Sequence, residues 1–265
     1  MKASAAKSHG RKSIRPTLQP RALMDAPEDL AHAWRADVLT LFADQFPGIL
    51  GVSLTGKALK NGLWQLHTHD LRSYGEGRHR NVDDTPAGGG PGMVMRADVL
   101  GRAIADVLRY RRCPCPIIYM SPRGAPLTQA RAQSLANGPG AVILCGRFEG
   151  VDQRVLDHFA IEELSIGDYV LSGGELAAQA MLDATVRLIP GVLGNNASIA
   201  EESFANGLLE HPQYTRPNEW EGRKIPDVLI SGNHQRVAQW RSTQAKAITK
   251  QRRPDLWQAW KNQHG

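Results

Sequence analysis

Short apolar runs alternate with segments of helical periodicity along most of the chain, and this alternation constrains the fold more than any other feature. Apolar runs that predict buried strands lie at residues 37–42, 63–67, 117–120, 141–145 and 161–166. Segments that predict helices lie at residues 55–60, 97–111, 127–136, 151–159 and 174–188. Within 97–111, for example, Val99, Ala103 and Val107 recur at helical spacing. Strands that alternate with helices predict an α/β fold around a parallel sheet.

Composition narrows the class of protein. The chain has 265 residues, and no run of 18 apolar residues occurs in it, so we expect neither a transmembrane helix nor a membrane partner. Cys113, Cys115 and Cys145 are an odd number of cysteines in a chain without a secretory signal. We therefore expect no disulfide framework and a cytoplasmic location. Cys113 and Cys115 lack the spacing of a zinc knuckle, so no metal site is predicted.

The net charge of +6 is distributed unevenly. Residues 1–24 hold six basic side chains and no acidic one, and residues 223–265 hold nine basic side chains against Asp227 and Asp255. The C-terminal segment also has four tryptophans in or near it. This combination favours a polyanionic partner such as nucleic acid, although a solvated helical face has the same pattern.

Four regions follow from the composition along the chain. Residues 1–33 lack sustained periodicity and predict a disordered basic extension. Their acid-poor composition also fits a transit peptide, and residues 28–34 could form a short helix. Residues 34–194 contain the predicted sheet, 195–206 form a linker, and 207–265 predict a small helical domain in which 228–230 is the one candidate strand.

Two local patterns resemble known site motifs, but neither is interpreted as a binding site. Residues 51–58, GVSLTGKA, nearly match a phosphate-binding loop, but Ala58 replaces the hydroxyl residue that would hold Mg²⁺. His67 and His69 flank Thr68 without a third spaced ligand, so we interpret them as part of a strand edge. Neither G-x-S-x-G nor H-E-x-x-H occurs, which removes the basis for an α/β-hydrolase or a zincin.

Glycines cluster after three successive predicted strands, at Gly124, at Gly146 and Gly150, and at Gly167, Gly173 and Gly174. Ligands of open α/β sheets bind at the carboxyl ends of the strands, where glycine lets the backbone approach a ligand closely. Each glycine taken singly is better explained by a tight turn, but three such loops in succession favour a ligand site. None of the clusters reads G-x-G-x-x-G, so a pyrophosphate site is not indicated.

Five blocks carry a family resemblance: GGGPGM (88–93), CGRFEG (145–150), SIGDYVLSGGE (165–175), IPGVLG (189–194) and GLLEHPQYTRP (207–217). In this order they resemble the bacterial tRNA (guanine-N1)-methyltransferases, the TrmD family, from about Asp37 to Arg253. The resemblance implies a SPOUT-type parallel sheet with a deep trefoil knot, a fold rarely seen, plus a small helical C-terminal domain. It also implies a homodimer with shared active sites, which methylates N1 of the guanine 3′ to the anticodon (position 37) in tRNA with S-adenosyl-L-methionine (SAM).

Guanine N1 carries a proton, so the reaction needs a base to remove it and a donor to stabilise the charge that develops on O6. The resemblance assigns the second role to Arg187. It places the base at Glu202, where the family pattern has Asp before Ser-Phe. The intrinsic pKa values of Asp and Glu are similar, so proton transfer stays feasible. Glu201 is the alternative base, and assistance by Mg²⁺ is left open.

The resemblance also implies two further sets of residues. Those expected to bind SAM are Tyr119, Ser121, Pro122, Gly146, Glu149, Ser165, Ile166, Gly167, Asp168, Tyr169, Val170, Leu171, Gly173 and Gly174. Those expected to bind RNA are Arg78, Arg80, Ser198, Arg216 and Arg241. The linker that contains Ser198 is expected to act as a lid over the guanine. Two other hypotheses remain: a catalytically inactive RNA-binding protein with the same fold, and a SPOUT enzyme that acts on another nucleotide.

Overall fold

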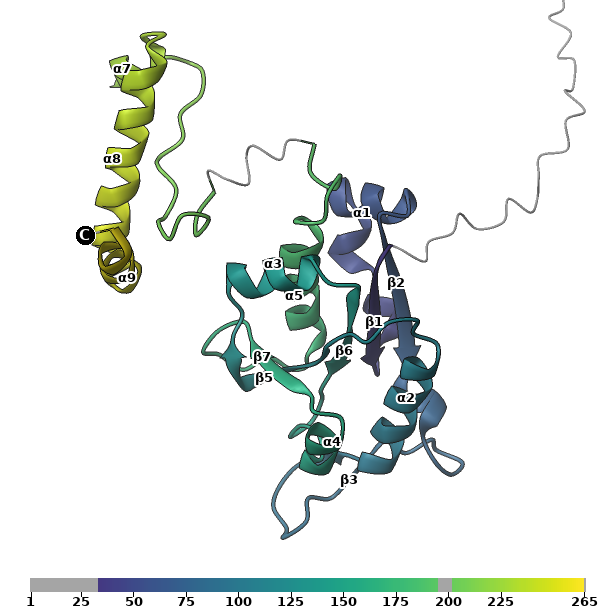
Figure 1. Cartoon of the computed structure of the whole chain (residues 1–265). Helices are drawn as coiled ribbons and strands as arrows, with labels where there is room; N and C mark the ends of the chain where they lie inside the picture. Colours follow the sequence, from purple (N-terminus) through teal and green to yellow (C-terminus); the bar gives the residue numbers. More distant parts are fainter. Residues whose placement is uncertain (1–32, 195–201, 265) are drawn as a thin grey trace, which may run out of the picture.

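A parallel sheet of five strands lies at the centre of the fold (Figure 1). The computed structural model describes residues 33–194 and 202–264. The strand order is β2-β1-β6-β5-β7, and every neighbouring pair is parallel. The strands are β1 (Trp34–Thr40), β2 (Trp64–Asp70), β5 (Ile117–Pro126), β6 (Gly140–Cys145) and β7 (Glu162–Ser165). The predicted α/β class with a parallel sheet is confirmed.

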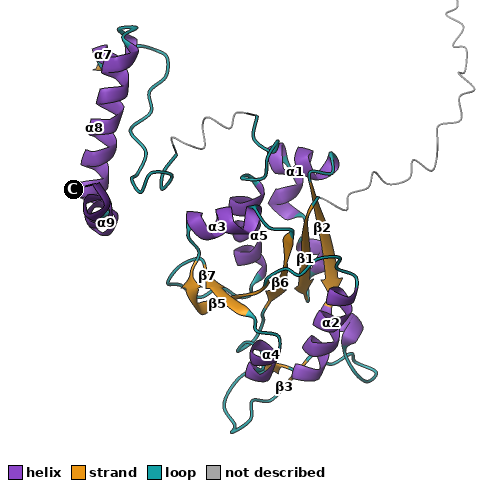
Figure 2. Cartoon of the chain, in the orientation of Figure 1, coloured by secondary structure: helices purple, strands orange, loops and turns teal. Residues whose placement is uncertain are grey.

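Helices cover both faces of this sheet (Figure 2). They are α1 (Ser53–Lys60), α2 (Ala97–Arg109), α3 (Gln129–Ala136), α4 (Gln153–His158) and α5 (Glu175–Val186). Residues of α1, α3 and α5 pack in the core on one face, and residues of α2 and α4 pack in the core on the other. The buried positions of α2 include Val99, Ala103 and Val107, as its periodicity predicts.

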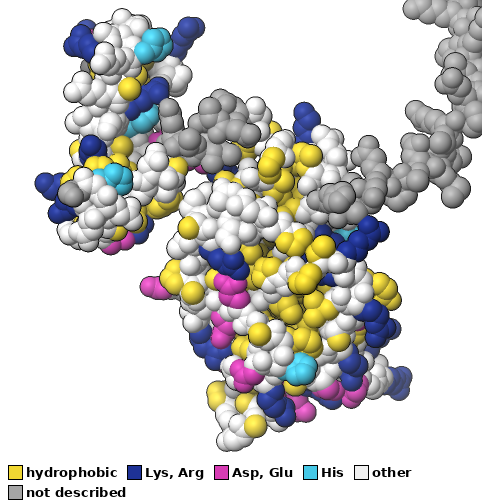
Figure 3. Space-filling view, viewed as in Figure 1, with side chains coloured by type: hydrophobic (Ala, Val, Ile, Leu, Met, Phe, Trp, Pro, Cys, Tyr) yellow, Lys and Arg dark blue, Asp and Glu magenta, His cyan; other side chains and the backbone are white. Residues whose placement is uncertain are grey.

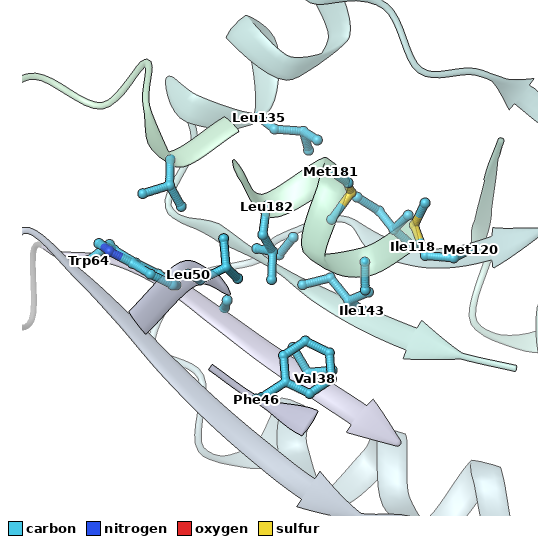
Figure 4. Packing of buried hydrophobic residues seen from close by; sticks show 14 of the residues in the cluster. Val38, Phe46, Leu50, Trp64, Ile118, Met120, Leu135, Ile143, Met181 and Leu182 are labelled. Carbon is cyan, nitrogen blue, oxygen red and sulfur yellow. The ribbon is translucent and has the colours of Figure 1, made fainter. Parts of the chain in front are cut away.

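Alternation along the strands divides the core between the two faces. In β1, Val38 belongs to the core under α1 and α5, whereas its neighbour Leu39 belongs to the core under α2. In β6, Ile143 and Leu144 divide in the same way. Figure 4 shows the first of these cores, where Val38, Ile143 and Leu182 of α5 lie close together. Strands buried on both faces explain why the sequence shows continuous apolar runs there.

Further elements complete the described part of the fold. They are the 3-10 helices η2 (Ala43–Gln45), η3 (Gly48–Gly51) and η4 (Leu71–Tyr74), the strand pairs β3 (Asp83–Asp84) with β4 (Val94–Met95) and β8 (Glu219–Trp220) with β9 (Arg223–Lys224), and the helices α7 (Asp227–Ile230), α8 (His234–Arg252) and α9 (Pro254–His264). None of the helices in the described ranges is long and apolar enough to cross a membrane.

Three local features of the structure differ from what the sequence predicts. The strand predicted at 228–230 is wrong, because these residues lie in α7, which follows Pro226 and has Asp227 in its first turn. The hairpin of β8 and β9 was not predicted. The helix proposed for 28–34 conflicts with β1, which begins at Trp34; residues 28–32 lie outside the described residues.

The strand predicted at 117–120 is longer in the structure and contains an irregularity after Met120. Met120 and Ala125 both pair with Leu164 of β7, so the four residues between them leave the ladder. The strand β5 then continues to Pro126. This excursion places Ser121 and Pro122 at the end of the sheet where the site described next is formed.

Candidate active site

Loops that follow three neighbouring strands enclose a hollow of about 220 Å³ at one edge of the sheet. We call it the strand-end hollow. It is lined by Tyr119, Met120, Ser121, Pro122, Gly146, Arg147, Phe148, Glu149, Gly150, Leu164, Ser165, Ile166, Gly167, Tyr169, Val170, Leu171, Ser172, Gly173, Gly174 and Ala177. Every residue that the sequence assigned to SAM is among them except Asp168, which is exposed beside it.

Two glycines allow the loops after β6 and β7 to touch. Gly174 N donates a hydrogen bond to Gly146 O at 2.9 Å. A Cβ at Gly174 would lie 2.8 Å from Cys145 Cα, and a Cβ at Gly146 would lie 2.5 Å from the ring of Tyr119. Such distances are shorter than side chains tolerate, so both positions require glycine for close packing rather than for an unusual backbone angle.

Hydrogen bonds within the loop after β7 fix its start and leave its apolar side chains exposed. Ser165 Oγ donates to Gly167 O at 3.0 Å and accepts from Gly167 N at 3.2 Å. Tyr169 Oη donates to Ile166 O at 3.3 Å. Tyr169, Val170 and Leu171 nevertheless expose a third or more of their surface. The loop therefore offers backbone groups and apolar walls to a ligand with an aromatic ring.

Arg187 and Glu202, the two predicted catalytic residues, are paired with each other. Arg187 Nη1 donates to Glu202 Oε2 at 2.7 Å, and Nη2 donates to Oε1 at 2.6 Å. The hydrogen bonds from Arg187 lower the pKa of Glu202, and the same bonds raise the pKa of Arg187. Both side chains are about a third exposed. The structure thus brings the two together, in a geometry that an ordinary partly exposed ion pair also explains.

A second hollow of about 250 Å³ lies beside Glu202 and is called the linker hollow. Its lining comes from the segment after the linker and from α8, and includes His211, Arg241 and Ser242. Glu202 therefore both lines the linker hollow and pairs with Arg187.

The predicted RNA-binding residues are distributed over several elements. Arg78 and Arg80 are exposed in the loop before the glycine run, and Arg216 is exposed before β8. Arg241 is half-buried in α8. Ser198, together with Glu201, lies outside the described residues. The glycine-rich loop meets the strand-end hollow, because Glu149 N donates to Met93 O at 2.9 Å.

The histidine pattern has a structural explanation. β2 is an edge strand, as predicted, and His69 Nε2 lies 2.8 Å from Oδ1 of the buried Asp37. In the part of the chain that the structure describes, no group of three or more His, Cys, Asp and Glu side chains could hold a metal ion.

A comparison with known families shows to which family the chain belongs. The sequence model described as "tRNA (Guanine-1)-methyltransferase TrmD" matches residues 34–259. The chain belongs to the TrmD family.

Three TrmD relatives, each named tRNA (guanine-N(1)-)-methyltransferase, show how close the similarity is. The protein of Roseobacter denitrificans is 66% identical over 89% of this chain and 98% of its own length. That of Ruegeria pomeroyi is 63% identical over 89% of this chain and 97% of its own length. That of Brucella suis is 59% identical over 90% and 96%, respectively. The resemblance predicted from about Asp37 to Arg253 is therefore confirmed and extends at both ends.

Several residues of the strand-end hollow were not among the sequence assignments. Arg147, Phe148, Ser172 and Ala177 line it, and the first three lie inside or directly beside blocks that carried the TrmD resemblance. Membership in a matching block was the available signal for Arg147. Arg147 forms an ion pair with the buried Glu175, and this pair could not have been predicted from spacing because the two residues are far apart in the chain.

Proposed function

We propose that the chain transfers a methyl group from SAM to N1 of the guanine that follows the anticodon in tRNA, position 37. The observation that carries this proposal is the strand-end hollow, which unites the residues that the TrmD resemblance assigns to SAM. The relatives' names supply the substrate and the reacting atom. A catalytically inactive RNA-binding protein is not favoured, because curated enzymes match nearly their whole length.

The residues of the hollow fit SAM as a methyl donor. Backbone groups of the loops after β6 and β7 suit the polar edge of adenine, and Tyr169 and Leu171 offer apolar walls. When bound, SAM supplies a methyl group already activated by a positive sulfonium. Burial raises the pKa of the Tyr119 hydroxyl.

Proton removal falls to Glu202, and charge stabilisation falls to Arg187. In their mutual pair, the arginine holds the pKa of Glu202 down, which makes the carboxylate a weaker base. Movement of the Arg187 guanidinium to guanine O6 would remove the hydrogen bonds that lower the pKa of Glu202. Glu202 would then be a stronger base and could accept the N1 proton. The same movement would place a positive charge where negative charge develops.

A homodimer with shared active sites is part of the proposal. Large apolar side chains are exposed on η3 and α1, on α5 and in the loop after β7; they include Ile49, Val52, Leu54, Tyr169, Val170 and Leu176. On the face seen in Figure 3, hydrophobic side chains gather over the centre of the part that holds the sheet. Exposed apolar side chains that gather on one face are typical of subunit interfaces. We expect twice the chain mass by light scattering, and the mass of one chain would contradict the dimer.

We also propose the domain regions and the knot that the resemblance implies. Residues 34–194 form the knotted methyltransferase domain, 195–206 the linker that closes over the guanine, and 207–265 a helical tRNA-binding domain that includes Arg216 and Arg241. The hydrogen bond from Gly174 N to Gly146 O keeps the loops after β6 and β7 in contact, which is compatible with the knot. Residues 1–33 are proposed as a basic extension.

The function is tested by methyl transfer to a tRNA transcript, followed by nuclease digestion and mass spectrometry of the nucleosides. We expect 1-methylguanosine at position 37, and none in a transcript with adenine there. Methylation of a ribose, or of another nucleotide, would favour a different SPOUT activity. No transfer to any tRNA would favour the inactive RNA-binding protein.

Arg78 and Arg80 are proposed to contact RNA phosphates, which predicts a change in salt dependence. Replacement of both by alanine should weaken tRNA binding and reduce the slope of log K against log salt by about one per lost contact. Filter binding at several salt concentrations measures this slope. Arg109→Ala, which removes an exposed arginine at the end of α2, is the matched control. An unchanged slope in the double variant would rule out phosphate contacts by these residues.

A further inference from the structure

A largely buried ion pair borders the strand-end hollow, since one of its partners, Arg147, lines the hollow. Arg147 follows β6 and Glu175 is the first residue of α5. Arg147 Nη2 lies 2.8 Å from Glu175 Oε2, and the two side chains are 18% and 1% exposed. A carboxylate that is almost completely buried costs free energy unless it is paired, and removal of one partner leaves the other charge uncompensated.

The pair connects the ends of three strands. Thr40, the last residue of β1, donates from Oγ1 to Glu175 Oε1 at 2.7 Å. On the other side, Arg147 Nη1 donates to Ser172 O at 3.1 Å, and its guanidinium carbon lies 4.2 Å from the centre of the Phe42 ring. The loops after β1, β6 and β7 are thereby held by one cluster of four side chains and one backbone carbonyl.

Close packing between the loop and the arginine makes this arrangement specific. A Cβ at Gly173 would lie 2.2 Å from Arg147 Nε, so the loop after β7 rests directly on the arginine side chain. Ser172, Gly173 and Gly174 all line the strand-end hollow. Any shift of the guanidinium would therefore move backbone groups that face the ligand.

We propose that Glu175 is a positioning residue for the methyl donor, acting through Arg147 on the loop of Ser172 to Gly174. Glu175 itself is too buried to touch the donor. Its carboxylate fixes the guanidinium, the guanidinium fixes the Ser172 carbonyl, and the loop holds its ligand-facing shape before the donor arrives. This inference rests on the proposed function, since it assumes that SAM occupies the strand-end hollow.

The test compares donor binding and turnover in Glu175→Gln, Arg147→Gln and the double variant, with the full chain. We expect the Kd and the KM for SAM to rise about tenfold in Glu175→Gln, while kcat at saturating SAM and tRNA falls less than about threefold. The Kd for SAM of the double variant should not exceed the higher Kd of the two single variants, because each single change already breaks the same ion pair. Glu162→Gln, which breaks the pair with Arg131 between β7 and α3, is the matched control and should bind SAM as the parent does.

Stability measurements separate positioning from a purely structural role. A purely structural role would lower the unfolding temperature of Glu175→Gln and leave the SAM Kd of the folded protein within about twofold of the parent; that result overturns the inference. Should Glu175→Gln not fold, Thr40→Val removes the hydrogen bond to Glu175 Oε1, together with the one that Thr40 Oγ1 accepts from Phe42 N at 3.0 Å, and leaves the charge of Glu175 in place. We then expect a smaller rise in the SAM Kd, and an unchanged Kd overturns the inference.

The two proposals fail in different ways. Parent protein that binds no SAM by calorimetry would remove both. Parent protein that binds SAM and methylates tRNA, together with a Glu175→Gln variant that binds SAM equally well, would remove the positioning role alone.

Discussion

Glu202→Gln is expected to reduce methyl transfer at least about a hundredfold, since general bases contribute rate factors of about 10² to 10⁴. The amide keeps the size of the side chain and can still accept a hydrogen bond from Arg187, which now pairs with both carboxylate oxygens. It cannot accept the N1 proton. Because Glu202 does not line the strand-end hollow, the Kd for SAM should stay within about twofold of the parent value. Single-turnover methylation and calorimetry measure the two quantities.

Two matched variants make this test specific. Glu201→Gln makes the same change at the neighbouring acid and should keep its activity. Glu202→Asp restores a carboxylate on a side chain shorter by one methylene and should recover much of the turnover. If Glu201→Gln is inactive and Glu202→Gln active, the base is Glu201; if both keep full activity, neither acid is the base.

The sheet could be predicted from the sequence because each strand is a continuous apolar run. Val142, Ile143 and Leu144, for instance, are all fully buried, and such runs belong to strands covered on both faces. The glycine clusters after β6 and β7 also lie where the strand-end hollow forms, because parallel strands bring their carboxyl ends to one edge. The strand predicted at 228–230 was wrong because three apolar residues in a row fit one turn of helix as well as a strand. Only the presence of neighbouring strands would distinguish a strand from a helix there.

Charged residues in the core could not be predicted in this way. Asp37 was read as part of an apolar strand, and its partner Arg111 follows a helix 74 positions later. The pair of Arg147 and Glu175 joins residues after different strands. Pairing of this kind depends on which strands are neighbours, and local periodicity has no information about strand order. For the same reason, local periodicity could not predict a knot, and only the family resemblance implies one.

Asp37 provides the second large expected effect, on stability. Its side chain is completely buried, with Arg35, His69 and Arg111 all within 2.8 Å of its carboxylate oxygens. Arg111 is itself only 5% exposed. Asp37→Asn keeps the shape but leaves the Arg111 charge without its buried counter-charge. Loss of one partner from a buried pair costs about 3–5 kcal/mol, so we expect the free energy of unfolding at pH 7 to fall by about that amount. Urea unfolding should show a lower midpoint with an unchanged slope.

The pH dependence of the same variant decides whether the charge of Asp37, rather than its packing, is responsible. Burial alone would raise the pKa of Asp37, but hydrogen bonds from His69 and Arg35 and the charges of Arg35 and Arg111 lower it from 3.8 to about 2. A lowered pKa means that the ionised carboxylate stabilises the folded state above about pH 4 and that this contribution is lost as pH falls toward 2. At 1.36 kcal/mol per pKa unit, the parent should lose about 2 kcal/mol of its free energy of unfolding over this interval through Asp37. Asp37→Asn should lack that part of the decline, so the stabilities of the two proteins converge in acid. Parallel curves from pH 7 to pH 2 would show instead that the cost of the substitution lies in packing.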